Sequence, residues 1–393
     1  MSDLPLDPAA LAHSERLRAL IRAEIVSAGG AIAFSRFMEL ALYAPGLGYY
    51  SAGAIKFGRS GDFVTAPELG PLFAECVAEA VAPVIHQIGE DVVFCEIGGG
   101  SGAFAEAAIK HLMTLDAMPA HYAILEPSAD LRERQRERLR ARLTPPVFDR
   151  VQWLDGPVDR PWRGVLFANE VIDALPTPRF LVRGGEVYEE HVALDGDGAF
   201  VRVHRPADAL LTAAVRHVER QRGDDFADGY RSELLPQLPY WLQAVMGGLE
   251  AGAMLLVDYG HPRREYYAPE RRDGTLRAFH RHHLVADVFA RVGLQDITAS
   301  VDFTALAEAG TGAGFEFAGY CSQASFLIGN GLERRLAAHE VRAADERARY
   351  ALRQQVQRLT LPAGMGERFQ AMGFERDVTF GTAFLAGDLS FRL

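Results

Sequence analysis

The first place where this chain is expected to do chemistry is the segment Glu96–Gly102, which reads Glu-Ile-Gly-Gly-Gly-Ser-Gly. Glycines allow the backbone to turn sharply and let a ligand lie directly against it. A helix that begins after such a turn presents free N–H groups to a carboxylate or a phosphate. The segment follows an apolar run and precedes a helical pattern, so it predicts a cofactor-binding turn; a turn without a ligand would leave the acid at its start unexplained.

Two classes of cofactor fit this turn. Gly98, Gly100 and Ala103 satisfy the dinucleotide pattern G-x-G-x-x-A, which would make the protein an NAD(P)-dependent oxidoreductase. Glu96 favours S-adenosyl-L-methionine instead, because an acid there can hold the cationic methionine end of that cofactor. Glu126, after the next apolar run, can accept the ribose hydroxyls of either cofactor. We favour a methyltransferase, with Gly102 completing the cofactor-binding turn.

Polar residues that could act on a methyl acceptor follow another apolar run, Val165–Ala168. Ligands lie at the carboxyl ends of parallel strands, so Asn169 and Glu170 are expected to face the transferred methyl group. A carboxylate there could clamp a guanidinium and help to remove its proton, which is hard to remove because the pKa of arginine lies above ~12. Asp173 either caps the following turn or takes part in catalysis, and the sequence leaves both alternatives open.

A glycine-rich stretch from Tyr43 to Pro67 precedes these motifs. Long irregular segments in compact domains are typical of lids and binding loops. Asp62 and Phe63 are therefore expected to cover the cofactor, although ordinary helix capping by Thr65 explains the same residues.

Alternating apolar runs and helical patterns must position these residues. This alternation predicts an α/β fold with a parallel, doubly wound sheet. Asp155, after the third strand, is expected to contact the adenine amine. The expected strands are 91–97, 122–125, 151–154, 165–168, 253–257 and 378–385; helices are expected at 9–28, 35–42 (with Ser35 as N-cap), 67–87, 102–113, 128–142, 206–249 and 304–370, and a β-meander at 180–205.

Composition limits the partners. The formal charge of −11 repels phosphate backbones, so no nucleic-acid partner is expected. No apolar run approaches the ~20 residues that span a bilayer, and nothing at the N-terminus resembles a signal peptide, so we expect a soluble, cytoplasmic protein without a membrane partner. Three distant cysteines and the cluster His280, His282 and His283 indicate no metal site, and a solvated loop is favoured for the histidines.

The spaced motifs resemble the methyltransferase family of the mitochondrial complex I assembly factor that methylates arginine (mitochondrial dysfunction protein A), in its bacterial branch. The resemblance implies a class I, Rossmann-like seven-stranded sheet, S-adenosyl-L-methionine as cofactor, and, for the mitochondrial member, a protein arginine as acceptor. Two positions depart from the family: the turn has Gly-Gly-Gly-Ser-Gly where many members have Gly-Pro-Gly-Arg-Gly, and Ser300 stands where a histidine is common. The motifs are Tyr43–Tyr50, Gly61–Glu68, Asn169-Glu170 with Asp173–Pro176, Asp258–Gly260, Gly274–Leu276, Asp296–Ala299 with Val301–Phe303, and Gln323 with Phe326-Leu327.

We thus expect a class I methyltransferase that acts on a protein side chain, most plausibly arginine, as a monomer or homodimer. The alternatives are a non-catalytic assembly factor that binds S-adenosyl-L-methionine and the oxidoreductase above. The expected parts are an N-terminal region with a covering loop (1–90), a methyltransferase core (91–180, 250–303 and 371–393), and helical and β-meander substrate-binding insertions (181–249 and 304–370).

The glycine turn yields a first testable prediction. The protein should bind S-adenosyl-L-methionine and its demethylated product in the micromolar range, and Gly100→Val should abolish binding, because a branched side chain would fill the space where cofactor meets backbone. Calorimetry measures both affinities. A folded variant that binds like the wild type would remove the turn from the site, and equal or tighter binding of NAD would overturn the choice of cofactor.

Overall fold

The computed structural model describes residues 7–52, 65–281 and 283–393, and a mixed β-sheet forms its centre. Seven of its eight strands run in the order β15-β16-β10-β5-β2-β3-β4, and the eighth, β14, pairs with β10 beside this path. The strands from β10 to β4 are parallel, whereas β16 lies antiparallel to both β10 and β15. The strands are β2 (Val93–Ile97), β3 (His121–Leu125), β4 (Val151–Leu154), β5 (Trp162–Asn169), β10 (Leu249–His261), β14 (Val301–Asp302), β15 (Glu316–Ser322) and β16 (Phe369–Arg376).

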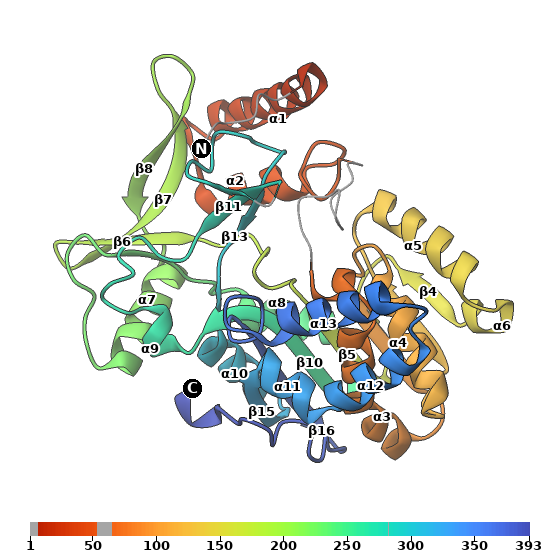
Figure 1. Ribbon diagram of the computed structural model, residues 1–393. Helices are drawn as coiled ribbons and strands as arrows, with labels where there is room; N and C mark the ends of the chain where they lie inside the picture. Colours follow the sequence, from red (N-terminus) through yellow and green to blue (C-terminus); the bar gives the residue numbers. More distant parts are fainter. Residues whose placement is uncertain (1–6, 53–64, 282) are drawn as a thin grey trace.

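Helices pack on both faces of this sheet, as Figure 1 shows, so the predicted doubly wound α/β fold is confirmed. One core joins α3, α4 and α11 to one face, and a second core joins α8 and α10 to the other. The helices are α3 (Leu72–Ile88), α4 (Ala103–Thr114), α5 (Ala129–Arg142), α6 (Pro145–Phe148), α8 (Leu238–Met246), α9 (Arg263–Tyr266), α10 (Phe303–Gly312), α11 (Gln323–Gly329), α12 (Leu332–Arg342) and α13 (Glu346–Thr360).

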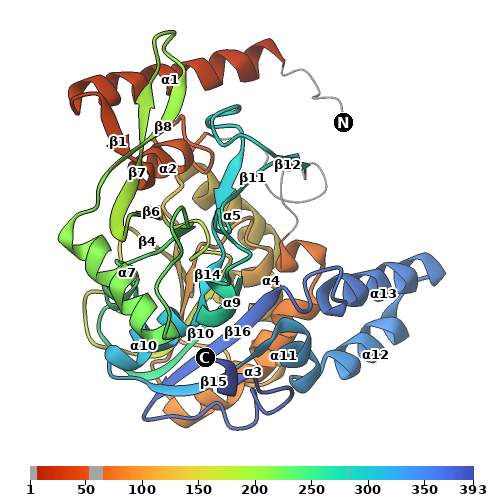
Figure 2. The same ribbon diagram turned by 90° about the vertical axis from the view of Figure 1, so that its left-hand side faces the viewer.

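A second layer of structure lies beyond the carboxyl edge of the central sheet. It contains the predicted β-meander, which is confirmed and forms a sheet with the N-terminal strand β1. In Figures 1 and 2 the helix α1 lies beside the β7–β8 ribbon. The remaining elements are α1 (Pro8–Ser27), β1 (Ala31–Ala33), α2 (Phe34–Tyr43), η1 (Ala66–Leu69), β6 (Arg179–Arg183), β7 (Glu186–Leu194), β8 (Phe200–Pro206), α7 (Ala209–Arg222), β9 (Arg231–Glu233), β11 (Arg277–His280), β12 (His283–Val285), β13 (Asp296–Thr298) and η2 (Ser390–Arg392).

Four local expectations were wrong. The helix expected at 67–87 is split into η1 and α3 at Gly70, whose φ of +145° a helix does not accommodate. The helix at 34–43 has Ala33, and not Ser35, at its N-cap. The segment 206–249 contains the strand β9 as well as helices. The solvated loop expected for the histidines is wrong for two of them, because His280 ends β11 and is only 8% exposed and His283 begins the paired strand β12; His282 lies outside the described residues.

The C-terminal strand assignment was also wrong. Residues 378–385 form turns, and the last strand is β16, which precedes them. Phe380 and Phe384 are buried against the outer strands; a side chain at Gly373 would come within 2.4 Å of Phe384. The apolar residues that suggested a strand therefore pack on the sheet without joining it. In addition, the segment 304–370 is not wholly helical, since β15 within it is an edge strand of the central sheet.

Within the described part of the chain, none of the helices is both long and apolar enough to cross a membrane. Nor does any group of three or more histidine, cysteine, aspartate or glutamate side chains among the described residues form a candidate metal site.

Close contact between the central strands requires glycine at two positions. Gly164 in β5 has a φ of +153°, and a side chain there would lie 1.8 Å from the carbonyl oxygen of Val93 in β2. Gly252 in β10 has a φ of +145° and would collide in the same way with the carbonyl oxygen of Gly164. These glycines let three strands approach, and those strands carry the loops described below.

Gly164→Ala should therefore destabilise the protein by about 3 kcal/mol, because it adds both backbone strain and overlap with the neighbouring strand. Denaturant unfolding measures the loss. Gly196→Ala is the matched control, since its added carbon meets no heavy atom of the described chain within 4 Å. Equal stability of the two variants would contradict the strain argument.

Candidate active site

A cavity of about 430 Å³ lies along the carboxyl edge of the parallel strands. The parallel strands lie side by side in the order β4-β3-β2-β5-β10. The predicted residues stand at the ends of these strands, so they line the cavity in the same order. Asp155 follows β4, Glu126 follows β3 and the glycine turn follows β2, while Asn169 ends β5 and Glu170 follows it. The sheet thus brings together nearly all the residues predicted from sequence.

The glycine turn has a conformation that favours glycine. Gly98, Gly100 and Gly102 have φ values of +70°, +52° and +78°. A side chain at Gly98 would come within 3.0 Å of Val171, and one at Gly99 within 2.8 Å of Ile124. The turn therefore leaves its backbone bare toward the cavity. Gly102 does not line the cavity; as the N-cap of α4 it begins the helix and makes no side-chain cap.

Hydrogen bonds fix the side chain of Glu126, which follows β3. It is 4% exposed, and the Ser128 N–H donates to its Oε1 over 3.0 Å. The Gln135 side-chain amide lies 3.3 Å from the other carboxylate oxygen and donates to the carbonyl of Gly100 over 2.8 Å. Burial raises the pKa of Glu126, while the Ser128 and Gln135 hydrogen bonds oppose this shift. These bonds fix the carboxylate relative to the glycine turn.

Gln135 is a site residue that our sequence reasoning missed. It is fully buried, and its carbonyl oxygen accepts a hydrogen bond of 2.9 Å from the indole of Trp153. The signal was present: within the Arg/Glu-rich helix, Gln135 stands four residues from both Leu131 and Leu139, on the buried face. A polar, uncharged residue on that face needs partners, and here they are the parts of the cofactor site.

Glu96 lies at the floor of the cavity. It is 3% exposed and accepts a hydrogen bond of 2.8 Å from the Tyr122 hydroxyl. Burial raises its pKa to about 8; the Tyr122 hydrogen bond opposes the shift and the nearby charge of Glu126 adds to it. A cationic group placed beside Glu96 would favour its ionised form, as expected for the methionine end of the cofactor.

Asp155 lies at the opposite, outer end of the cavity, and its side chain is 97% exposed. The guanidinium of Arg132 donates to it over 2.6 Å and to the carbonyl of Leu154 over 2.5 Å. This hydrogen bond lowers the pKa of Asp155, which keeps it ionised. A contact with adenine remains a prediction for this residue.

Glu170 stands at the end of β5, with its backbone in the left-handed region at a φ of +54°. For a residue other than glycine this conformation costs energy, and such strain is concentrated at functional sites. The Asn169 side-chain amide donates to its carboxylate over 3.0 Å. Burial, followed by the charge of Asp173, raises the pKa of Glu170 to about 8.

Asp173 is 5% exposed and lines the same end of the cavity. The Tyr259 hydroxyl donates to its Oδ2 over 2.5 Å, and its Oδ1 has no hydrogen-bond partner among the described residues. Burial raises its pKa to about 6, against the hydrogen bond from Tyr259. The turn itself is held by Asp258, which accepts from the N–H groups of Ile172 and Asp173 over 3.0 and 3.2 Å.

Two tyrosines from the end of α2 and the following turn line the same cavity as Glu170 and Asp173. The rings of Tyr43 and Tyr50 stack with centroids 5.5 Å apart. Their hydroxyls donate to the carbonyl of Ala174 over 2.9 Å and to Asp296 over 3.0 Å. Beyond them, the Ser101 hydroxyl donates to Glu68, which joins η1 to the glycine turn. The other residues predicted to cover the cofactor, Asp62 and Phe63, lie outside the described residues.

A Rossmann-like sheet with a bare glycine turn, a fixed carboxylate after the next strand and acids after β5 defines a class of protein, the nucleotide-cofactor-binding α/β enzymes. The residues fit S-adenosyl-L-methionine, because Glu126 could accept hydrogen bonds from the ribose hydroxyls and Glu96 could balance the positive charge of the methionine end. When bound, this cofactor supplies a methyl group on a positively charged sulfur.

Comparison with known proteins identifies the family. The family described as "Putative S-adenosyl-L-methionine-dependent methyltransferase" matches residues 76–321, more than half of the chain. A Burkholderia thailandensis protein, solved bound to S-adenosyl-homocysteine, is 43% identical, with both chains fully covered and a TM-score of 0.91. A second B. thailandensis structure is 41% identical, again with full coverage of both chains, and has a TM-score of 0.88. The chain belongs to this family of S-adenosyl-L-methionine-dependent methyltransferases.

Curated relatives are more distant. The mitochondrial protein arginine methyltransferase NDUFAF7 of Danio rerio is 28% identical over 88% of this chain and 83% of its own length. The corresponding protein of Homo sapiens is 26% identical over 88% of this chain and 80% of its own. The family resemblance predicted from sequence is thereby confirmed, and the oxidoreductase alternative is set aside.

The Gln135 contacts lead to a prediction about cofactor affinity. Gln135→Leu should weaken binding of S-adenosyl-homocysteine about tenfold, because the glycine turn and Glu126 lose the hydrogen bonds that fix their relative positions. Calorimetry measures the change, and Glu137→Gln on the exposed face of the same helix is the control. Unchanged affinity in a folded Gln135→Leu variant would show that this residue supports the fold alone.

Proposed function

We propose that the methyl acceptor is an arginine side chain of a protein. The observation that carries this proposal is the charge of the acceptor end. Glu170 and Asp173 line it, and one buried oxygen of Asp173 has no partner among the described residues. Arg132 is the single basic side chain among the described residues that line the cavity, and it lies at the far end beside Asp155. A site with acids and no local cation favours a cationic acceptor.

The raised pKa values support the same proposal. Burial, followed by the charge of Asp173, raises the pKa of Glu170 to about 8, so this acid keeps its proton at neutral pH in the free protein; burial raises the pKa of Asp173 to about 6. A guanidinium, which is planar and always charged, could donate to both carboxylates at once and would favour their ionised forms. A neutral hydroxyl or thiol acceptor would leave at least one acid without a counter-charge.

Glu170 would then act as orienting group and base. One nitrogen of the guanidinium forms a bond to the methyl carbon and gives up its proton to the Glu170 carboxylate. The electron pair of the broken carbon–sulfur bond remains on the departing sulfur. Most of the rate gain in such a displacement comes from positioning, which the Asn169 amide and the strained backbone of Glu170 support. The names of the curated relatives, protein arginine methyltransferases, support arginine as the acceptor.

The experiment that tests this proposal uses methyl-labelled S-adenosyl-L-methionine, the purified protein and lysate from a strain that lacks it. Labelled bands would be excised and hydrolysed, and the labelled amino acid identified. We expect methylated arginine in one or a few proteins. Label in lysine, in a small molecule, or in no component at all would overturn an arginine acceptor; the last result would instead support a non-catalytic assembly factor.

Glu170→Gln separates cofactor binding from methyl transfer. Affinity for S-adenosyl-homocysteine should change little, while transfer should fall by ~10²-fold because the base is lost. For the wild type, kcat/KM should rise with pH as Glu170 ionises, with its midpoint near the pKa of about 8. The variant should lack this rise, and Glu186→Gln at an exposed position should retain it. A wild-type profile in the Glu170 variant would remove this residue from the chemistry.

Stability offers a readout that needs no acceptor. Folding raises the pKa of the Glu170 carboxyl from 4.5 to about 8, so the folded protein binds the proton more tightly than the unfolded chain does. The wild type should therefore lose stability relative to Glu170→Gln as the pH rises from 4.5 to about 8, and the difference should level off above that range. Thermal unfolding across this range measures it; a constant difference would mean that folding does not raise the pKa of Glu170.

A further inference from the structure

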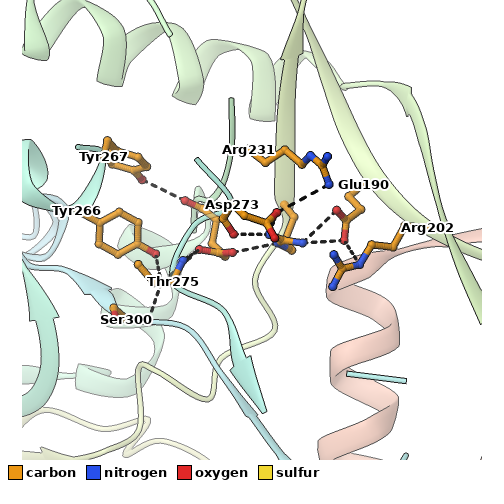
Figure 3. Close-up of polar contacts among 10 residues, drawn as sticks. Glu190, Arg202, Arg231, Tyr266, Tyr267, Asp273, Thr275 and Ser300 are labelled. Carbon is orange, nitrogen blue, oxygen red and sulfur yellow. Dashed lines mark hydrogen bonds and ion pairs between the residues drawn. The ribbon is translucent and has the colours of Figure 1, made fainter. Parts of the chain in front are cut away.

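An ion-pair network has Arg179 of β6 at its centre; the centre is buried, whereas Asp273 at its edge is exposed. Arg179 is 1% exposed, and each of its five N–H groups is used. Its Nε donates to Glu233 of β9 over 2.9 Å, and Nη1 donates to both oxygens of Glu190 of β7 over 3.0 Å. Its Nη2 donates to the carbonyl and the side chain of Asp273 over 2.7 and 3.2 Å. Figure 3 shows this network, with Arg202 and Arg231 flanking Glu190 and Asp273.

The second oxygen of Glu233 binds the turn at Gly274-Thr275, a family motif for which the sequence suggested no function. It accepts from the Thr275 N–H over 2.7 Å and from the Thr275 hydroxyl over 3.2 Å. Gly274 has a φ of +76°, and a side chain there would lie 2.4 Å from both oxygens of Glu233. The Glu233 carboxylate is thus in close contact with the backbone of this turn, and only glycine at position 274 leaves room for that contact.

The same turn is connected to Asp173 by hydrogen bonds from two consecutive backbone N–H groups. The Thr275 hydroxyl oxygen accepts a hydrogen bond of 3.0 Å from the N–H of Ser300, drawn in Figure 3. The N–H of the preceding residue, Ala299, donates to the carbonyl of Asp173 over 3.0 Å. Asp173 is the residue whose unpartnered carboxylate oxygen lies at the acceptor end. The Thr275 hydroxyl is therefore the link between the ion-pair network and the loop that carries this acid.

We propose that Thr275 is a positioning residue for methyl transfer, which couples the buried Arg179–Glu233 ion pair to the placement of Asp173 through Ser300 and Ala299. The proposal rests on the proposed function, since it assumes that Asp173 faces the acceptor. The network contributes three guanidinium groups and three carboxylates, so its charges balance internally. The network therefore carries no net charge that would attract a ligand of its own. We infer that it affects methyl transfer by positioning Asp173.

The test uses two substitutions at one position. Thr275→Val keeps the size of the side chain and removes the hydroxyl, whereas Thr275→Ser keeps the hydroxyl. Tyr266→Phe is the matched control. The Tyr266 hydroxyl lies 3.2 Å from the Thr275 oxygen, and Figure 3 draws this contact. The N–H groups of Ser300 and Ala299 bond instead to Thr275 and Asp173. Two readouts apply to each variant, namely hydrogen exchange of the peptide over residues 296–302 and methyl transfer to the acceptor found by lysate labelling.

We expect faster exchange of the Ser300 amide in Thr275→Val than in the wild type, and about a tenfold lower kcat, as for the loss of one well-placed hydrogen bond. The affinity for S-adenosyl-homocysteine should not change, because Thr275 does not line the cofactor cavity. Thr275→Ser should restore both exchange and kcat, and Tyr266→Phe should match the wild type in both. A merely structural role would lower the amount of folded protein without this split between kcat and cofactor affinity.

Unchanged exchange in Thr275→Val would overturn the link to Ser300, and faster exchange with an unchanged kcat would overturn its role in methyl transfer. If Thr275→Val does not fold, Thr275→Ala replaces it, with the same expected pattern. The exchange measurement needs no acceptor, so it tests the link even if lysate labelling detects no methylated protein. Failure of the proposed function and failure of this inference are therefore distinguishable.

Discussion

The parallel register of β4, β3, β2, β5 and β10 is the constraint on which the rest of this protein depends. Parallel strands end at the same edge of a sheet, so the polar residues that follow them are collected there in strand order. In this chain that order places Asp155, Glu126, the glycine turn and Glu170 along one cavity. At Gly164 and Gly252 the central strands approach one another so closely that a side chain would overlap the neighbouring backbone.

Burial of acids at one end of the cavity gives the site its chemical character. An ionised carboxylate loses favourable hydration when it is removed from water, which is why the pKa values of Glu96, Glu170 and Asp173 are raised. Hydrogen bonds from Tyr122, Asn169 and Tyr259 offset part of this cost. A positively charged group bound beside these acids would stabilise their ionised forms further. The methionine end of the cofactor and the proposed guanidinium acceptor both carry such a charge.

Two of the acids are held by residues that do not themselves line the cavity and that come from distant parts of the chain. Gln135 on α5 aligns Glu126 with the glycine turn, and Asp258 on β10 holds the turn that carries Asp173. Such supporting contacts keep side chains within the small tolerance that group transfer requires. The cavity is therefore built as much by these buried polar residues as by those that face it.

Sequence by itself determined the features that depend on local chemistry. Apolar runs followed by turns predicted five of the core strands, and glycine spacing with Glu96 and Glu126 predicted the cofactor class and both carboxylates. These signals are local because strand formation, tight turns and strand-end acids are encoded within a few residues. The same local reasoning selected Asn169, Glu170 and Asp173, which line the same cavity; that they face the acceptor remains a prediction.

Only the tertiary structure decided what depends on contacts between distant segments. The apolar residues around Phe380 and Phe384 resemble a strand in sequence. In the structure they pack against Gly373, which belongs to β16, and β16 is the strand that joins the sheet. Gln135 and Thr275 gain their roles from partners 35 and 25 residues away, in Gly100 and Ser300. A hydrogen bond across such separations leaves no periodicity in the chain, because its existence is set by how whole elements pack and not by the residues beside it.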